Sequence, residues 1–546
     1  MRNATACKQC RQSKRRCARP AVDGVPCNNC HRRFQHCSFC PLPHDRPRHL
    51  NVSIAPEVQS PDSSRPEDLL ARLTNTQKLA LVDNYFALIH DRPHSLFHRP
   101  TFMAELQANR IRTSLILSVC ALASYLSTDD AIRTLGQEMA LASKNLLLAD
   151  IGSPAIAHIQ TAILLATIYA AERQPRADAM FFAIGARMAQ ILRLHDVHEG
   201  DDAVTAETKA RVWWTLIMFD YWGSAGLMIR RQLEHQPSNI PYPGPEDIFQ
   251  AARPFQQTLE VPGSGLWAHM INLVKIFGFI QDLHQELATQ RLSHSDVDSK
   301  VEDLAKRLDA WASALPKGVV LSDDNIKDHI SRGLGGAFMA LHLGFHHYFT
   351  LLFYHSLDSY QPPTVNKSTF TQRCRGHAMK YSELLQTSRN TPGCEASYPV
   401  MGHMAVVSSS VLLHMLLFGD DNELVGARES LMGNFAALVE LEKFWPSLGV
   451  SMRRLHTFQD VCRQPANMST YRIDQWMFRF LYEHSNSIGD RVAPKEGGGG
   501  GDSCSVSPAA SMMSSNAEAP PLPPRFQEVA KGREAVLTSA LDFLRR

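Results

Sequence analysis

Six cysteines near the N-terminus form two similar groups whose spacing suits a metal ion. Each group is a CxxC pair followed, after six further residues, by a third cysteine. The six are Cys7, Cys10, Cys17, Cys27, Cys30 and Cys37. Two thiolates separated by two residues can bind one tetrahedral zinc ion, and metal binding can fold a module too small to have a hydrophobic core. The spacing therefore predicts a zinc-bound module within residues 1–45.

A basic segment, RQSKRR, lies between Cys10 and Cys17. Its four cations are Arg11, Lys14, Arg15 and Arg16. Residues 1–49 hold eleven Lys and Arg against two acidic residues, a net charge of +9, so the remainder of the chain carries −7. A basic head on a mildly acidic body favours contact with phosphates at the head alone. We therefore expect double-stranded DNA to be a partner of the N-terminal module.

The distribution of cysteines argues against a disulfide framework. Seven of the twelve cysteines lie in the first forty residues, and the other five are scattered along the rest of the chain. No apolar stretch precedes Cys7, so we expect no secretory signal peptide and a reducing compartment. In such a compartment, clustered cysteines are expected to be metal ligands.

The remaining chain divides by composition. Residues 46–66 are rich in proline and are expected to form an extended linker. Residues 67–490 repeat apolar positions at helical spacing and have almost no period-two alternation, which predicts one large all-α domain. Residues 491–524 form a Gly, Ser and Pro tract that is expected to be disordered. Residues 525–546 have an apolar stripe and predict an amphipathic helix that either binds a coactivator or docks on the body.

Two uncharged runs, Ser114–Ser127 and Met401–Gly419, raise the question of a membrane. The first is shorter than the roughly twenty apolar residues that a spanning helix needs. The second contains two histidines and three consecutive serines. We therefore interpret both runs as buried core helices and expect no membrane partner.

Six thiolates are too few for two separate four-ligand zinc sites. If two of them bridge a pair of zinc ions, however, each ion obtains four sulfur ligands. With the basic segment between the second and third cysteines, this pattern resembles the fungal zinc binuclear cluster family of transcription factors. The resemblance implies two short helices around two zinc ions, with Cys7 and Cys27 as the bridging ligands. It assigns the remaining ligands in pairs, Cys10 and Cys17 to one ion, and Cys30 and Cys37 to the other.

The resemblance also assigns the DNA contacts. In the family, a lysine three residues before the third cysteine reads the guanines of a CGG triplet in the major groove, and this position is Lys14. An ammonium group suits the O6 and N7 acceptors that guanine presents there. Arg11, Arg15 and Arg16 are expected to contact phosphates. The chain departs from many members at Ser13, where they carry a second basic residue, and in its longer loop at residues 18–26.

Three segments of the body resemble the fungal transcription factor regulatory domain, also called the middle homology region. They are Asn84–Phe102, Ala186–His198 and Lys209–Leu227. The resemblance implies a nuclear RNA polymerase II transcription factor, and a pathway-specific activator is expected. Many relatives dimerise through a coiled coil after the cluster, but no run of apolar heptads precedes Pro66. The alternatives are therefore a monomer on one triplet and a homodimer formed through the helical body.

The body offers few residues for chemistry of its own. The aromatic residues of these segments are expected to be core. Arg211 and Asp220 are a candidate ion pair. His342 and His346 have a spacing that suits a metal but are interpreted as capped or satisfied histidines. Since there is no Gly-rich phosphate loop, GxSxG or HExxH motif, we expect no enzyme. Two other functions stay open: a metabolite-binding switch whose helical body controls the output, and a helical enzyme fused to a zinc module.

Overall fold

The structure is a computed structural model, and it divides into two compact units, Met1–Ser63 and Ser64–Arg546. It describes residues 17, 27, 66–92, 94–233, 238–259, 263–289, 292–358, 365–396, 398–462, 470–489 and 491. Of the ten predicted zinc and DNA-binding residues, it therefore describes Cys17 and Cys27. Outside the described residues lie the other eight: Cys7, Cys10, Arg11, Lys14, Arg15, Arg16, Cys30 and Cys37. The C-terminal linker beyond residue 491 and the predicted C-terminal helix also lie outside them.

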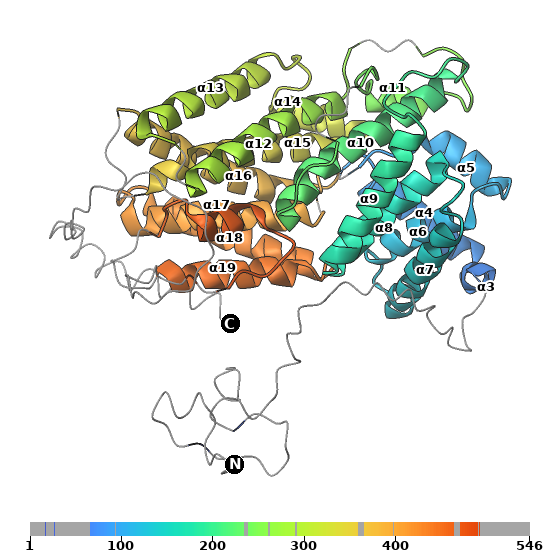
Figure 1. Cartoon of the computed structure of the whole chain (residues 1–546), viewed down its shortest axis with the longest axis horizontal. Coiled ribbons are helices and arrows are strands. Elements are labelled where there is room, and N and C mark those ends of the chain that lie inside the picture. The colour runs from blue at the N-terminus through green and yellow to red at the C-terminus, as the bar shows by residue number, and fades with distance from the viewer. Residues whose placement is uncertain are drawn as a thin grey trace, which may run out of the picture. The chain divides into compact units, whose positions relative to one another are not determined.

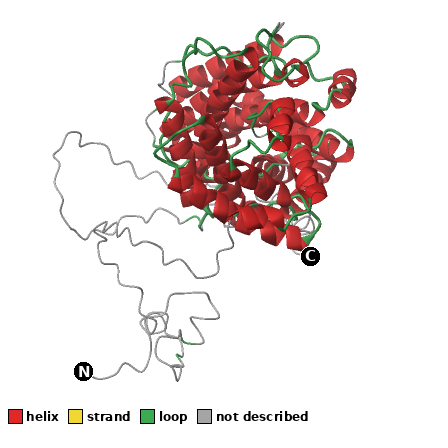
Figure 2. Cartoon of the chain, turned by 90° about the vertical axis from the view of Figure 1, so that its right-hand side faces the viewer, coloured by secondary structure: helices red, strands yellow, loops and turns green. Residues whose placement is uncertain are grey.

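The described residues of the second unit form helices and contain no strand (Figure 2), so the all-α prediction is confirmed for this part of the chain. The first helices in chain order are α3 (Pro66–Ala71), α4 (Asn75–Leu88), α5 (Arg99–Gln107), α6 (Thr113–Ser124), α7 (Asp130–Ala149), α8 (Ile156–Ala171), α9 (Pro175–Ile191) and α10 (Ala203–Leu227). They lie side by side within the second unit (Figure 1).

The chain then continues through a second group of helices that pack mainly on one another (Figure 1). These are α11 (Glu246–Ala251), α12 (Leu266–Ala288), α13 (His294–Ser313), α14 (Asp323–Ser331), α15 (Gly335–Phe353), the 3-10 turn η1 (Tyr354–Leu357), α16 (Lys367–Asn390), α17 (Val400–Phe418), α18 (Leu424–Glu442), α19 (Leu448–Cys462) and α20 (Gln475–Tyr482). Helix α10 contacts both α9 of the first group and α12 of the second.

Polar side chains define where several of these helices begin. Thr74 forms a capping box with Gln77 at the start of α4, and the Asp129 carboxylate accepts a hydrogen bond from the backbone N–H of Ala131 at the start of α7. Asp202 caps α10 in the same way by accepting from the N–H of Thr205. Each cap satisfies a backbone donor that has no partner within its helix.

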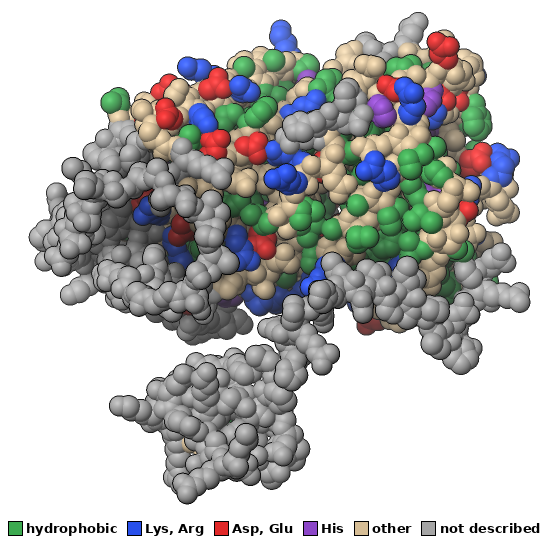
Figure 3. All heavy atoms as spheres, viewed as in Figure 1, with side chains coloured by type: hydrophobic (Ala, Val, Ile, Leu, Met, Phe, Trp, Pro, Cys, Tyr) green, Lys and Arg blue, Asp and Glu red, His purple; other side chains and the backbone are tan. Residues whose placement is uncertain are grey.

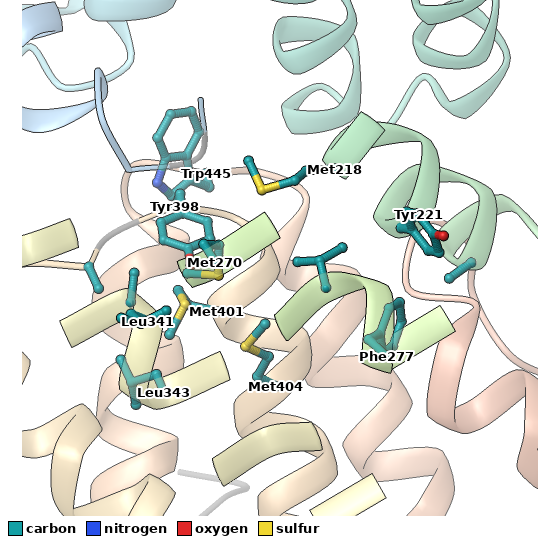
Figure 4. Packing of buried hydrophobic residues seen from close by; sticks show 14 of the residues in the cluster. Met218, Tyr221, Met270, Phe277, Leu341, Leu343, Tyr398, Met401, Met404 and Trp445 are labelled. Atoms are coloured by element: carbon teal, nitrogen blue, oxygen red, sulfur yellow. The ribbon is translucent and has the colours of Figure 1, made fainter. Parts of the chain in front are cut away.

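The core is built around helices that are apolar on all sides. Helix α17 is long and apolar enough to span a membrane, yet 89% of its most apolar stretch is buried among other helices of the described chain. Figure 4 shows side chains of α10, α12, α15 and α17 that pack together, among them Met218, Met270, Leu341 and Met404. The interpretation of the two uncharged runs as core helices is therefore confirmed, because α6 is also almost wholly buried.

One face of the described body mixes the two signs of charge (Figure 3). On the face shown in Figure 3, Lys and Arg side chains alternate with Asp and Glu, and hydrophobic side chains gather where α8, α9 and α10 lie. Helix α9 contributes Met180 and Ile191, which are 62% and 60% exposed. This face therefore lacks the uniform positive charge that binding to a phosphate backbone requires.

Many histidines of the body are buried in the core, and burial lowers their pKa. Burial brings the pKa of His284, His347 and His414 down from 6.5 to about 3, and neighbouring cationic or imidazole groups add to the effect. The pKa of His355 falls to about 4 for the same main reason. These imidazoles are therefore neutral in the folded protein well below the pH at which they take up a proton in the unfolded chain.

This difference predicts that acid destabilises the body. Above pH 6.5 both states hold these histidines neutral, so their full contribution to stability is present. As the pH falls below 6.5 the unfolded chain gains protons that the folded chain does not, and each such group removes about 1.4 kcal/mol per pH unit. Urea unfolding should therefore show a clearly lower midpoint at pH 5.5 than at pH 7.5. An equal midpoint at the two pH values would contradict this assignment.

Candidate functional site

Two of the three segments singled out in the sequence, the first and the third, meet at one buried arginine. Arg211, on α10, donates hydrogen bonds from its guanidinium to the Ser95 hydroxyl at 2.9 Å and to the Gly244 carbonyl at 2.7 Å. The ring of His195, which follows α9, lies 5.5 Å from the ring of Trp213. We call Arg211, Ser95, Glu207, Gly244 and Glu246 the Arg211 junction. It joins the first segment to the third.

The charges of the Arg211 junction are arranged around a side chain that is fully buried. Arg211 Nε donates to the Glu207 carboxylate at 2.9 Å, and Glu246 and Asp91 each have an oxygen 4.0 Å from Nη1. Burial raises the pKa of Asp91, but His90 and Arg211 outweigh it and bring the value down to about 2. At Glu246 burial wins, and the pKa is raised despite Arg211. His90 and the guanidinium together thus keep the Asp91 carboxyl group ionised.

The expected pairing of Arg211 with Asp220 is wrong. Asp220 instead accepts hydrogen bonds from the backbone N–H groups of Gln232 and Leu233, at 2.9 and 2.7 Å. The two residues are nine positions apart on α10, which is two and a half helical turns, so they point to opposite sides of the helix. Helical geometry therefore places Asp220 on the side of α10 that faces the backbone of residues 232 and 233, away from the guanidinium.

The aromatic residues Phe97, Phe102, Trp213 and Trp214 of these segments are core, as expected. The rings of Phe97 and Phe102 lie 5.1 Å apart, and both side chains are buried. Trp213 is fully buried, while the indole N–H of Trp214 donates to the Pro241 carbonyl at 2.9 Å. These side chains therefore hold the helices together and line no ligand site of their own.

His342 and His346 are each engaged separately. His342 Nε2 lies 3.0 Å from the Val319 carbonyl oxygen, and His346 Nδ1 lies 2.9 Å from His377 Nδ1. Among the described residues, no group of three or more metal-ligating side chains is present. The interpretation of His342 as a satisfied histidine is confirmed by its backbone partner.

A pocket that sequence reasoning missed lies between α8, α9 and α10 on one side and α17, α19 and the residues after α20 on the other. Its cavity volume is about 150 Å³, and the pocket opens to solvent. Aromatic and aliphatic walls include Phe182, Phe219, Trp222, Val400 and Leu448. No sequence signal points to it, because its lining residues come from six separate segments and each looks like ordinary helical core.

The polar groups of this pocket contribute less of its surface than the apolar groups do. They include Asp178 in the first turn of α9, Arg173 just before α9, His403 on α17 and His484 after α20. Burial raises the pKa of Asp178 to about 7. It lowers the pKa of His484 to about 4 and that of His403 well below 6.5. An apolar cavity with a small number of convergent polar groups is the usual form of a small-molecule site.

The N-terminal unit is represented by two of the predicted zinc ligands. Cys27 is fully buried and Cys17 is partly buried. The rest of the predicted ligand set and all of the predicted DNA contacts lie outside the described residues. The zinc and DNA-binding assignments therefore stay predictions.

Residues 82–313 match the family model described as the fungal specific transcription factor domain. This part of the chain is therefore similar to the fungal specific transcription factor domain. The match contains all three segments singled out in the sequence, so their resemblance to the regulatory domain is confirmed. It also contains the Arg211 junction and the α8, α9 and α10 side of the pocket, whereas α17 and α19 lie beyond it.

Curated relatives agree with this assignment. The Zn(2)-C6 fungal-type transcription factor FTF1c of Fusarium oxysporum is 22% identical over 408 residues, which cover 67% of this chain and 43% of that protein. The uncharacterized transcriptional regulatory proteins C1327.01c and C530.11c of Schizosaccharomyces pombe are 21% and 22% identical, over 58% and 69% of this chain. The matches span 36% and 52% of those two proteins, so the chain corresponds to only part of the length of these relatives.

The Arg211 junction predicts a large stability cost for loss of its cation. Arg211→Met should destabilise the protein by about 3 to 5 kcal/mol, because it leaves Glu207 and Glu246 without their buried counter-charge. The control is Arg307→Met on α13, where an exposed guanidinium pairs with Asp303 at 2.9 Å and should contribute less than about 1 kcal/mol. Urea unfolding measures both variants. Equal losses would show that the Arg211 junction is not a buried charge cluster.

Proposed function

We propose that this protein is a sequence-specific DNA-binding transcription regulator that reads a CGG triplet through an N-terminal zinc binuclear cluster. One observation carries the proposal. The six-cysteine spacing with its basic insert precedes, in one chain, a helical body that matches the fungal specific transcription factor domain. The Fusarium relative is named a Zn(2)-C6 fungal-type transcription factor, which agrees with this proposal.

In this proposal two zinc ions fold the N-terminal module. Cys7 and Cys27 bridge the ions, and the other four cysteines complete the two tetrahedral shells in pairs. Thiolates suit zinc, and a shared pair gives four sulfur ligands to each ion. The full burial of Cys27 fits a ligand that faces the interior of such a cluster. The zinc ions supply the folding free energy of the module and take no part in chemistry.

Recognition of DNA is proposed to combine one base contact with several phosphate contacts. Lys14 reads the guanines, and Arg11, Arg15 and Arg16 fix the module on the backbone. The mixed charge of the body's face shown in Figure 3 supports contact through the head. A protein with this role works in the nucleus, and a pathway-specific activator of RNA polymerase II transcription is the form we propose.

The proposed organisation follows the sequence boundaries. Residues 1–45 form the DNA-binding module, 46–66 and 491–524 are linkers, 67–490 are the regulatory body, and 525–546 form a helix that contacts a coactivator or the body. The protein binds either as a monomer or as a homodimer through the body. Since no zipper follows the cluster, the distance between two half-sites would be set loosely.

A second function is favoured by the pocket of the body. A cavity with mainly apolar walls and several polar side chains that draws on helices from both groups is the arrangement expected of a ligand-responsive regulatory domain. A ligand that binds one arrangement of the helices better than another would shift the equilibrium between them. We propose that the body acts as a metabolite-sensing switch on the DNA-binding output and that it has no enzymatic activity.

The zinc assignment predicts the effect of removing one thiolate. Cys10→Ala should abolish both zinc retention and DNA binding, because the metal free energy that folds the module is lost. Cys40→Ala, just outside the motif, is the matched control and should leave both intact. Zinc content by mass spectrometry and binding to a CGG duplex measure the two variants. Retention of zinc and DNA binding by Cys10→Ala would overturn the cluster.

The DNA contacts predict two different losses. Lys14→Ala should weaken binding by about 1 to 3 kcal/mol on a CGG duplex and relax the preference for that triplet. Arg15→Ala should weaken specific and random DNA alike and reduce the slope of log affinity against log salt by about one. Fluorescence anisotropy over a salt series separates these effects. Equal losses on both DNAs for both variants would contradict the assigned roles.

A further inference from the structure

Asp178 places an unpaired carboxyl group in the wall of the pocket. It lies in the first turn of α9, close to Phe182, and it is half-buried. No hydrogen bond or ion pair joins its carboxyl group to another described side chain. Burial alone raises its pKa to about 7. A carboxyl group that is crowded by protein atoms yet keeps accessible surface, and that has no partner, is available to a ligand.

The surroundings of Asp178 are mainly apolar. Phe182, Phe219 and Trp222 contribute aromatic surface, and Val400 and Leu448 contribute aliphatic surface from the opposite side. An acid in such surroundings is costly to ionise unless a positive charge comes close to it. The ligand that this pocket would bind most favourably is therefore a cation with an apolar body.

The other titratable groups of the pocket do not meet this demand. His403 and His484 are held neutral near pH 7 because burial lowers the pKa of both. His403 Nε2 lies 2.8 Å from the Leu481 carbonyl oxygen, and His484 Nε2 lies 3.3 Å from that of Trp222. Arg173 lines the same pocket, but it is exposed and no ion pair joins it to Asp178 among the described residues.

We propose that this pocket binds an apolar organic amine, whose ammonium group pairs with the Asp178 carboxylate while its hydrocarbon part packs on Phe182, Phe219 and Trp222. This inference rests on the proposed ligand-responsive body and names the class of ligand. It is independent of the zinc and DNA assignments. An ammonium group at this position supplies the counter-charge that the protein itself lacks.

The position of the pocket gives such a ligand a means to act on the body. The backbone N–H of Ser447, before α19, donates to the Ala171 carbonyl at the end of α8 at 3.0 Å. The N–H of Ser485 likewise donates to the Gly226 carbonyl of α10 at 3.2 Å. Both hydrogen bonds join the two sides of the pocket. A ligand between those sides would therefore stabilise the docked arrangement of the two helix groups.

Binding should also depend on pH in a defined direction. Near pH 7 the empty pocket holds Asp178 about half protonated, whereas the bound ammonium keeps it ionised, so binding releases a proton. Affinity should therefore fall as the pH drops below 7, approaching tenfold per unit, and level off above it. The remaining titratable groups lining the pocket do not change charge in this range. Arg173 keeps its charge, His403 and His484 are neutral, and burial raises the pKa of Tyr398.

Calorimetric titration of the zinc-loaded full chain tests this inference. The probes are 2-phenylethylamine, the neutral 2-phenylethanol and the anionic 3-phenylpropanoate, each measured at pH 6 and pH 8. The amine should bind at least tenfold more tightly than the other two at pH 8 and lose most of that advantage at pH 6. Asp178→Asn should remove both the advantage and the pH dependence, while the control Asp303→Asn on α13 should change neither.

The results of these titrations distinguish the amine assignment from the proposal of a ligand-responsive body. Equal binding of the amine and the alcohol, or an unchanged amine affinity in Asp178→Asn with a native unfolding midpoint, would overturn the amine assignment and leave a ligand-binding body. Absence of saturable binding by all three probes would overturn both the amine and the ligand-responsive body. DNA binding, measured on the same samples, reports separately on the zinc module. If Asp178→Asn fails to fold, the pH dependence of the unaltered protein decides the question.

Discussion

A buried guanidinium is the constraint on which the described body depends. The side chain of Arg211 is fully buried, and a charge in that position is tolerated only if its donors are satisfied and counter-charges lie close by. Its partners come from a segment before α5, from its own helix and from the loop before α11. Because the Arg211 guanidinium needs hydrogen-bond acceptors and counter-charges, it fixes α10 against chain segments that are far apart in the sequence.

Helix α10, which Arg211 holds in place, also forms part of the pocket wall. Its first half contains Arg211, and its last turns contribute Phe219, Trp222 and Leu227 to the pocket wall. Gly226 permits the close approach there, because a Cβ atom at this position would lie 2.5 Å from the ring of His484. One helix thus connects the most charged part of the core with the cavity proposed to bind a ligand. A shift of α10 would affect both.

The sequence predicted those features that rest on local pattern. Helical periodicity predicted the all-α body and its core helices, and the segments around Phe97, His195 and Trp213 indicated the regulatory domain. The pairing of Arg211 with Asp220 failed because residue type was considered without helical phase. The pocket escaped prediction because its acid, Asp178, and its walls on α17 and α19 are brought together by tertiary packing alone. A single aspartate at the start of a helix is normally interpreted as a residue that stabilises the helix through its dipole.

We propose that a zinc-folded head that binds DNA is joined to a helical body that binds a small molecule. The central claim is that the head reads a CGG triplet, and selection of bound sequences from random DNA by the zinc-loaded full chain tests it most directly. The account predicts enrichment of CGG, either singly or as pairs at several spacings, and loss of enrichment when zinc is chelated. Enrichment of no triplet, or enrichment that survives removal of zinc, would contradict it. Two triplets at one fixed spacing would contradict the loosely set half-sites that follow from the absence of a zipper.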